Sequence, residues 1–243
     1  MKYLIIFAFI FTNACQNKVL QNQTTVASIP QTVNKNHSIS TENQSDEFEG
    51  EIFTDENKIG KRQANRIEIY TYKKAEKFFV KTKFYSKSQS QWIQKNEVDV
   101  ERFGELSLRT EIKDFNGDGF NDVTFVSSVA ARGANEIRDL FIYNPQKDEL
   151  IHIKNSSDYP NLGYNPLLKC LDSWIFTGST MTVFLRLKDD KLIEFASVED
   201  GMTERFIYVN DRNGDKQLLR REKRKDDGFD RYINFNPVRI YKE

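Results

Sequence analysis

The 243-residue chain has little cysteine and histidine, two residues of each. A disulfide scaffold needs many more cysteines, and a structural zinc site needs several Cys or His ligands, so both classes are excluded. An excess of either charge is also lacking, because Lys plus Arg and Asp plus Glu each number 36. A neutral chain has no overall attraction to phosphate backbones, and we expect no nucleic-acid partner.

Long hydrophobic runs are absent as well. The apolar run at residues 3–11 is much shorter than the roughly 20 residues that span a bilayer. Hydrophobic residues make up only 38% of the chain, whereas aromatic residues reach 13%, with 19 Phe and 10 Tyr. Because aromatic side chains favour strands, this composition predicts an all-β protein.

The first residues resemble a bacterial lipoprotein signal peptide. Lys2 precedes the apolar run, and Ala14-Cys15 matches the junction at which such proteins are cut and their cysteine is acylated. The resemblance implies a signal peptide at residues 1–14 and lipidation of Cys15. We therefore expect a lipoprotein anchored to a membrane of the bacterial cell envelope, on its periplasmic or surface face.

The next segment, residues 15–47, is predicted to be a polar, flexible tether. Within residues 16–45, 18 of the 30 residues are Asn, Gln, Ser or Thr, and none is aromatic. Such a segment cannot bury enough apolar surface to offset the entropy lost on ordering. The remainder, residues 48–243, is predicted to form a single all-β domain.

Short segments rich in Ile, Val, Phe, Tyr and Thr recur in this domain, separated by Asn, Asp, Gly and Pro. This pattern predicts antiparallel strands in a propeller-like or sandwich arrangement. A short helical turn is considered only at residues 72–77. The predicted strands cover residues 66–72, 77–85, 105–112, 123–129, 139–143, 150–153, 174–177, 182–187, 192–196, 205–209 and 231–235.

One loop concentrates residues that can hold a metal ion. Side-chain oxygens stand at its positions 1, 3, 5 and 9, and a backbone carbonyl is available at position 7: Asp114, Asn116, Asp118, Asp122 and Phe120. Ca²⁺ takes six to eight oxygen ligands, and Gly119 at position 6 allows the sharp turn. Three carboxylates in nine residues repel one another unless a cation lies between them. The loop therefore predicts a Ca²⁺ site.

The loop is not an EF-hand, because Phe125 occupies the position at which an EF-hand carries a bidentate Glu. Its flanks are predicted strands, so it resembles the DxNxDGxxD calcium loops of integrin-type propeller blades. The alternative is an Asx-rich hairpin turn without metal. Two other segments match the calcium-loop pattern only in part, Asp211–Asp215 and Asp226–Asp230. Because their ligand sets are incomplete, they are interpreted as hairpin turns.

Other reactive residues give no catalytic pattern. His152 is interpreted as a strand residue, Cys170 as a buried free thiol, and the basic run at residues 220–225 as a solvated strand or hairpin face. No nucleophile or acid–base set can be identified, and we expect no enzyme activity. The weaker alternative is a hydrolase whose catalytic carboxylates are scattered along the chain.

Residues 111–199 resemble a bacterial family, the calcium-binding periplasmic immunity lipoproteins. These neutralise peptidoglycan-hydrolase toxins delivered by type IV secretion systems and are similar in outline to lysozyme inhibitors. The resemblance is carried by the calcium loop and by the order of the segments after it: Val123–Ser128, the corner Phe141–Pro145, Leu150–Ile153, Trp174–Gly178, Thr182–Leu187 and Lys191–Phe195.

This resemblance implies a propeller-like fold, one Ca²⁺, and inhibition of a muramidase-type enzyme through a protruding loop. The candidate loop consists of Gly178, Ser179 and Thr180. The expected function is thus that of an immunity-type inhibitor, with a peptidoglycan hydrolase as its protein partner. The alternative is a surface adhesion or glycan-binding β module, also without catalytic activity.

Overall fold

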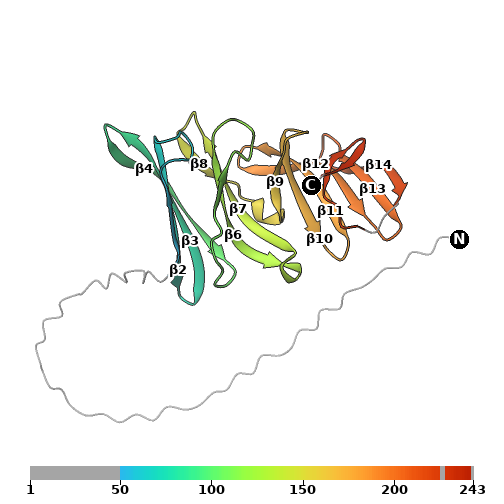
Figure 1. Ribbon diagram of the computed structural model, residues 1–243, viewed down its shortest axis with the longest axis horizontal. Helices are drawn as coiled ribbons and strands as arrows, with labels where there is room; N and C mark the ends of the chain where they lie inside the picture. Colours follow the sequence, from blue (N-terminus) through green and yellow to red (C-terminus); the bar gives the residue numbers. More distant parts are fainter. Residues whose placement is uncertain (1–49, 225–227, 242–243) are drawn as a thin grey trace, which may run out of the picture. The chain divides into compact units, whose positions relative to one another are not determined.

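Within each sheet of the computed structural model, which describes residues 50–224 and 228–241, strands that follow one another in the chain pair as antiparallel neighbours (Figure 1). The first sheet has the order β1-β2-β3-β4 and the second the order β5-β6-β7-β8. Their strands are β1 (Ile52–Asp55), β2 (Asn65–Lys74), β3 (Lys77–Ser88), β4 (Gln91–Arg102), β5 (Glu111–Lys113), β6 (Asp122–Ala130), β7 (Asn135–Asn144) and β8 (Glu149–His152).

The third sheet is larger, with the order β14-β13-β12-β11-β10-β9, and a separate hairpin follows it. Its strands are β9 (Leu162–Asn165), β10 (Cys170–Phe176), β11 (Thr180–Lys188), β12 (Lys191–Asp200), β13 (Glu204–Asn210) and β14 (Lys216–Lys223), and the hairpin is β15 (Tyr232–Phe235) with β16 (Val238–Ile240). Two single-turn 3₁₀ helices, Ala131–Gly133 and Ser156–Asp158, complete the described structure. The all-β, antiparallel prediction is confirmed.

Three hydrophobic cores hold the sheets together. The first contains residues from β2, β3, β6, β7 and β8, and so joins the first and second sheets. The second contains residues from β7, β10, β11 and β12, and joins the second and third sheets. The third lies between the third sheet and the final hairpin, where Tyr232 is fully buried.

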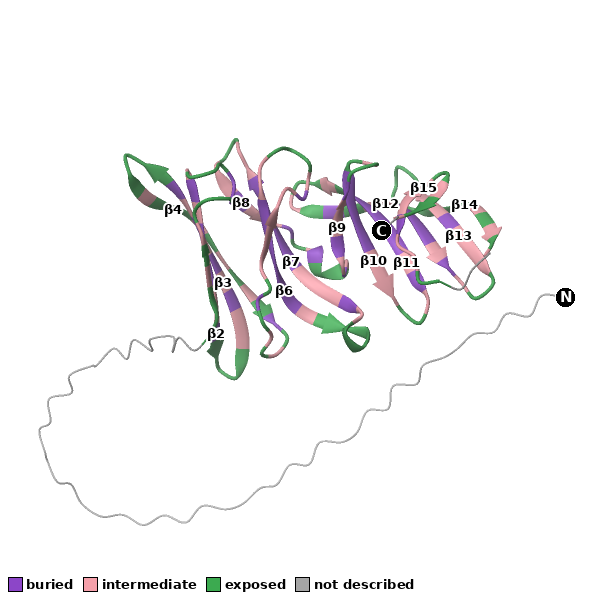
Figure 2. Ribbon diagram, viewed as in Figure 1, coloured by how far each residue is buried: buried purple, intermediate pink, exposed green. Residues whose placement is uncertain are grey.

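Strand β7 contributes side chains to the cores on both faces of the second sheet. Successive side chains of a strand point to opposite faces, so Phe141 and Tyr143 enter the first core while Leu140 and Ile142 enter the second. All four are at most 4% exposed, and Figure 2 shows the long buried stretches on β6 and β7. An uninterrupted apolar run is the pattern expected of a strand that is covered on both faces.

Two sequence predictions are corrected. The helical turn considered at residues 72–77 is wrong: β2 continues to Lys74, and Ala75 and Glu76 form a two-residue turn with φ values of 47° and 65°. The strand predicted at residues 105–112 is mostly irregular, because β5 begins only at Glu111.

Strands β1, β4, β9, β14 and β16 were not predicted at all. The tether, the signal peptide and Cys15 lie outside the described residues. Within the described part of the chain, no helix has the length and apolar character needed to cross a membrane.

Candidate functional site

The predicted calcium loop connects β5 to β6, and two phenylalanines hold its ends on different cores. Phe115 is fully buried in the second core. Phe120 packs against the first core, with its ring 5.5 Å from that of Tyr143 in an edge-on arrangement. Because these rings are on opposite faces of the second sheet, the polar residues between them are held at the junction of two cores.

Backbone N–H groups hold the first carboxylates of the loop. Asp114 accepts hydrogen bonds from the N–H groups of Gly117 at 2.6 Å, Asp118 at 3.2 Å and Gly119 at 2.8 Å. Asp118 accepts one from the N–H of Phe120 at 2.9 Å, and the Asn116 amide donates to its other oxygen at 2.9 Å. The loop is therefore tightly curled, as the spacing of its Asx residues predicts.

Asp122 is the last residue of the loop and the first residue of β6, and it has no exposed surface. Its two oxygens accept hydrogen bonds from the N–H of Phe115 at 2.8 Å and the N–H of Tyr143 at 2.9 Å. Burial raises the pKa of Asp122 to about 8, against the effect of those two hydrogen bonds, and the charges of Asp118 and Asp114 raise it further. The negative charge of the ionised Asp122 carboxylate is therefore poorly compensated by its surroundings.

Among the described residues, no cationic side chain forms an ion pair that would compensate the charge of Asp122. Asp114, Asp118 and Asp122 form no ion pair with any described Lys, Arg or His; Lys113, beside the loop, pairs instead with Glu111. The residues described also contain no group of three or more His, Cys, Asp or Glu side chains placed to hold a metal ion. The three aspartates share one loop, but each is engaged with backbone N–H groups.

Lone pairs nevertheless remain on each carboxylate. A carboxylate offers about four acceptor sites, and three are used on Asp114 and two on Asp122. The chemistry of the donor set, three carboxylates with an amide and a carbonyl, fits a hard cation such as Ca²⁺. The donor types therefore suit the predicted ion, but the described structure does not gather the three carboxylates into a cluster that could hold it.

Gly117 and Gly119 provide the left-handed corners of the loop, with φ values of 77° and 90°. A Cβ on Gly117 would lie 2.4 Å from the hydroxyl oxygen of Tyr164 in β9, whereas a Cβ on Gly119 would meet nothing within 4 Å. The loop thus packs against the third sheet at Gly117. It also contacts the β1–β2 connection, where the N–H of Gly60 donates to the carbonyl of Asn121 at 2.9 Å.

The predicted partner-binding residues lie at the turn between β10 and β11. Gly178, with a φ of 93°, is exposed at the tip, and the N–H of Thr177 donates to the carbonyl of Ser179 at 2.9 Å. Thr180 is buried as the first residue of β11 and is 2% exposed. A partner could reach Thr177, Gly178 and part of Ser179, but hardly Thr180.

Aromatic side chains lie beside this turn, and no local sequence pattern predicts that they associate. The Phe176 ring lies 6.4 Å from the Trp174 ring and 5.4 Å from the ring of Phe229, which is 63% exposed. Asn135 of β7 fixes the same segment by bonding both the carbonyl and the N–H of Phe176, each at 2.9 Å. These contacts join residues far apart in the chain.

The remaining candidates have structural roles. Cys170 is a buried free thiol, as predicted, and burial raises its pKa to about 12. His152 lies on β8, where its Nε2 is 2.8 Å from a carboxylate oxygen of Asp139. The Asp211–Asp215 segment is the predicted hairpin turn, between β13 and β14. In the Asp226–Asp230 segment, residues 226 and 227 lie outside the described residues.

Comparisons with known proteins give one weak structural likeness to report. No family model and no curated protein matches the chain. Among solved structures, one described as that of a Xanthomonas type IV secretion system related protein is similar, with a TM-score of 0.44 and 10% sequence identity. The similarity covers 70% of this chain and 93% of that chain.

Proposed function

We propose that this protein is a calcium-binding, lipid-anchored envelope protein that binds and inhibits a peptidoglycan hydrolase and has no catalytic activity of its own. The observation that carries the proposal is the sequence of the β5–β6 loop, in which aspartate or asparagine stands at loop positions 1, 3, 5 and 9. None of its three aspartates forms an ion pair with a described cationic side chain. The inhibitory role rests on the family resemblance of residues 111–199.

Calcium would be held by the side chains of Asp114, Asn116, Asp118 and Asp122 and by the Phe120 carbonyl. A bound cation would supply the positive charge that the buried Asp122 lacks, and would relieve its repulsion from the other two carboxylates. Because the loop is joined to both cores through Phe115 and Phe120, the ion would stabilise the contact between sheets. The role of calcium in this proposal is structural.

The surface proposed to bind the hydrolase is the β10–β11 turn with the aromatic side chains beside it. Aromatic residues are enriched in protein interfaces because they bury a large area at a low cost in conformational entropy. Gly178 and Phe229 are exposed here, and Asn135 anchors the turn to the second sheet. A rigid, exposed turn suits insertion into an enzyme's substrate groove.

The proposal is tested by measuring peptidoglycan hydrolysis by muramidase-type enzymes, including any encoded beside this gene, with and without the purified protein. We expect the wild type to inhibit at least one of them and Ser179→Arg, which places a large charged side chain at the turn, to inhibit at least about tenfold less. The matched control is Asn213→Arg in the β13–β14 turn, which should inhibit like the wild type.

Two outcomes would contradict this function. One is the absence of both inhibition and complex formation with every hydrolase tested. The other is equal inhibition by Ser179→Arg and the wild type, which would remove the β10–β11 turn from the interface. Specific binding on a glycan array, without any hydrolase complex, would favour the adhesion or glycan-binding alternative.

A further inference from the structure

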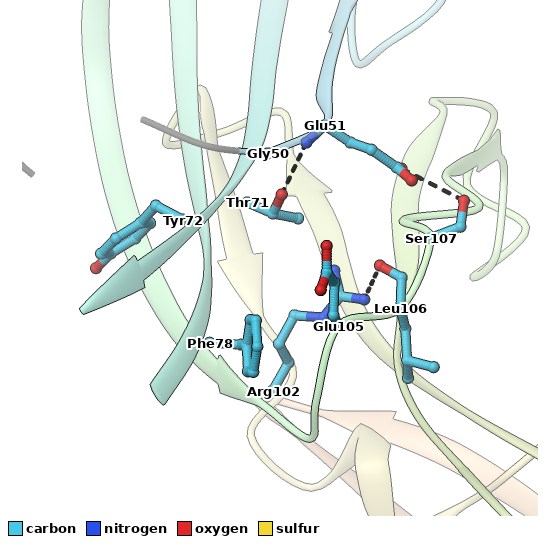
Figure 3. Close-up of a pocket in the computed structure, with 9 residues that line it drawn as sticks. All are labelled: Gly50, Glu51, Thr71, Tyr72, Phe78, Arg102, Glu105, Leu106 and Ser107. Atoms are coloured by element: carbon cyan, nitrogen blue, oxygen red, sulfur yellow. Dashed lines mark hydrogen bonds between the residues drawn. The ribbon is translucent and has the colours of Figure 1, made fainter. Parts of the chain in front are cut away.

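A pocket of about 660 Å³ lies at the first sheet, where β2, β3, the end of β4 and the residues before β1 meet the β4–β5 connection. Figure 3 shows Arg102 and Glu105 in the middle of this pocket, with Phe78 and Leu106 on either side of them. Thr71 and Glu51 line it from β2 and from the residue before β1. We call it the Arg102 pocket.

Arg102 is unusual because it is only 6% exposed and yet forms no ion pair with any residue in the described ranges. One guanidinium nitrogen donates to the carbonyl of Leu106, and the buried Nε has no hydrogen-bond partner. Burial lowers the pKa of this guanidinium, although the charges of Glu51 and Glu105 oppose that effect. A buried charge without a paired counter-charge is costly, so this arginine is suited to an incoming anion.

Two carboxylates in the same pocket, those of Glu51 and Glu105, favour a ligand that also carries a positive charge. Glu51 accepts hydrogen bonds from the N–H of Leu108 at 2.8 Å and the hydroxyl of Ser107 at 3.3 Å, both on one of its oxygens. Glu105 is exposed. A ligand with a carboxylate alone would be repelled by these two glutamates, whereas one that also carries a cation would be attracted by them.

We propose that the Arg102 pocket binds a small zwitterion of the α-amino-acid type. The planar guanidinium of Arg102 matches a carboxylate, and the ammonium group one carbon away is placed toward Glu51 and Glu105. An apolar side chain on the ligand packs beside Phe78 and Leu106. The pocket volume is within the range of small-molecule sites, and the inference does not depend on the calcium or hydrolase proposals.

The first test is calorimetric titration of the full chain with L-leucine and two matched analogues. One analogue, 4-methylpentanoate, lacks the ammonium group, and the other, 3-methylbutylamine, lacks the carboxylate. We expect saturable binding of L-leucine and at least about tenfold weaker binding of each analogue, since each loses a charge-assisted interaction. No binding of L-leucine at millimolar concentration, or equal binding of the three compounds, would overturn the proposal.

The second test assigns the binding to this pocket by substitution. Glu105→Gln should weaken L-leucine binding about tenfold and leave the affinity for 4-methylpentanoate the same or higher, because only the ammonium contact is lost. Arg102→Lys retains the charge but loses the planar fork, and should weaken both ligands. The control is Glu101→Gln, whose carboxylate pairs with Lys77 instead. Equal effects of the Glu105 and Glu101 substitutions would place the binding elsewhere.

Discussion

At the scale of single residues, Asp122 links the loop chemistry to the packing of the sheets. Its side chain joins the start of the loop to β7 through the N–H groups of Phe115 and Tyr143. Because it is fully buried among hydrophobic side chains, its charge is expensive unless a cation is near. If the loop binds a cation as proposed, this one position would connect ion binding to the stability of two cores.

Gly117 and Gly119 give a prediction that separates backbone strain from steric contact. Both have positive φ, so an alanine at either position costs about 1–2 kcal/mol of stability. Gly117→Ala should cost more than Gly119→Ala, because its Cβ would also collide with the Tyr164 hydroxyl. Urea unfolding of the two variants measures the difference.

The control for this prediction is Tyr164→Phe, which removes the hydroxyl. Combined with Gly117→Ala it should recover part of the lost stability, since the two changes share one contact. If Gly117→Ala and Gly119→Ala unfold at the same urea concentration, the loop does not pack against β9 as described.

Residue-level prediction from the sequence worked where the pattern is local and failed where it is not. The alternation of Asp114, Asn116 and Asp118 is visible in five residues, and it correctly predicts a curled loop between two strands. Arg102 and Asn135 carry no such sign. Arg102 is identified only by its hydrogen bond to the carbonyl of Leu106. Asn135 is identified only by its hydrogen bond to the carbonyl of Phe176, which joins the second sheet to the third.

At the scale of elements, Asp148 in the β7–β8 turn links the first and second sheets. It accepts hydrogen bonds from the hydroxyl of Tyr143 in β7 at 2.8 Å and from the amide of Asn65 in β2 at 3.1 Å. Burial disfavours its charge, but the side-chain hydrogen bonds from Ser86, Tyr143 and Asn65 outweigh burial and hold the pKa of Asp148 below its ordinary value.

This lowered pKa predicts how the link depends on pH. A carboxyl whose pKa is lower in the folded than in the unfolded state stabilises the fold above its unfolded pKa of about 4, and this stabilisation is lost as the pH falls through the folded value. The difference in unfolding free energy between wild type and Asp148→Asn should therefore shrink below about pH 4. Urea titrations at several pH values measure it. A difference that stays constant across this range would contradict the prediction.

Strand prediction failed mainly for exposed edges and for very short strands. Strand β4 alternates polar residues with few apolar ones, and its side chains are largely exposed, so it lacks the buried pattern that identified β2 and β3. Strand β14 is almost entirely exposed for the same reason. The β2–β3 turn has no sequence signal for a hairpin, because Ala75 and Glu76 adopt positive φ where Gly or Asn is usual.

At the scale of the whole molecule, composition was enough to predict an antiparallel all-β protein, because aromatic and β-branched segments recur at short spacing. How the sheets share their cores could not be predicted. The apolar run Leu140–Tyr143 indicates a strand, but which of its faces meets which sheet depends on residues distant in the chain.

Anchoring is tested by localisation of the full chain. If Cys15 is acylated as proposed, Cys15→Ser should move the protein from the membrane fraction to the soluble fraction and abolish incorporation of radiolabelled fatty acid, because the acyl chains would be its anchor. An alanine at the neighbouring Asn17 is the control and should remain in the membrane fraction. A Cys15→Ser protein that stays membrane-bound would contradict lipidation at this residue.

The central claim, that the β5–β6 loop is a calcium site, is tested most directly by thermal unfolding of the full chain in Ca²⁺ and in EDTA. A ligand that binds only the folded state at a hundredfold excess over its Kd stabilises it by about 2.7 kcal/mol. We predict a higher Tm in Ca²⁺ for the wild type and for Asp211→Asn, and a much smaller shift for Asp118→Asn. An unchanged wild-type Tm, or an equal shift in Asp118→Asn, would contradict the account.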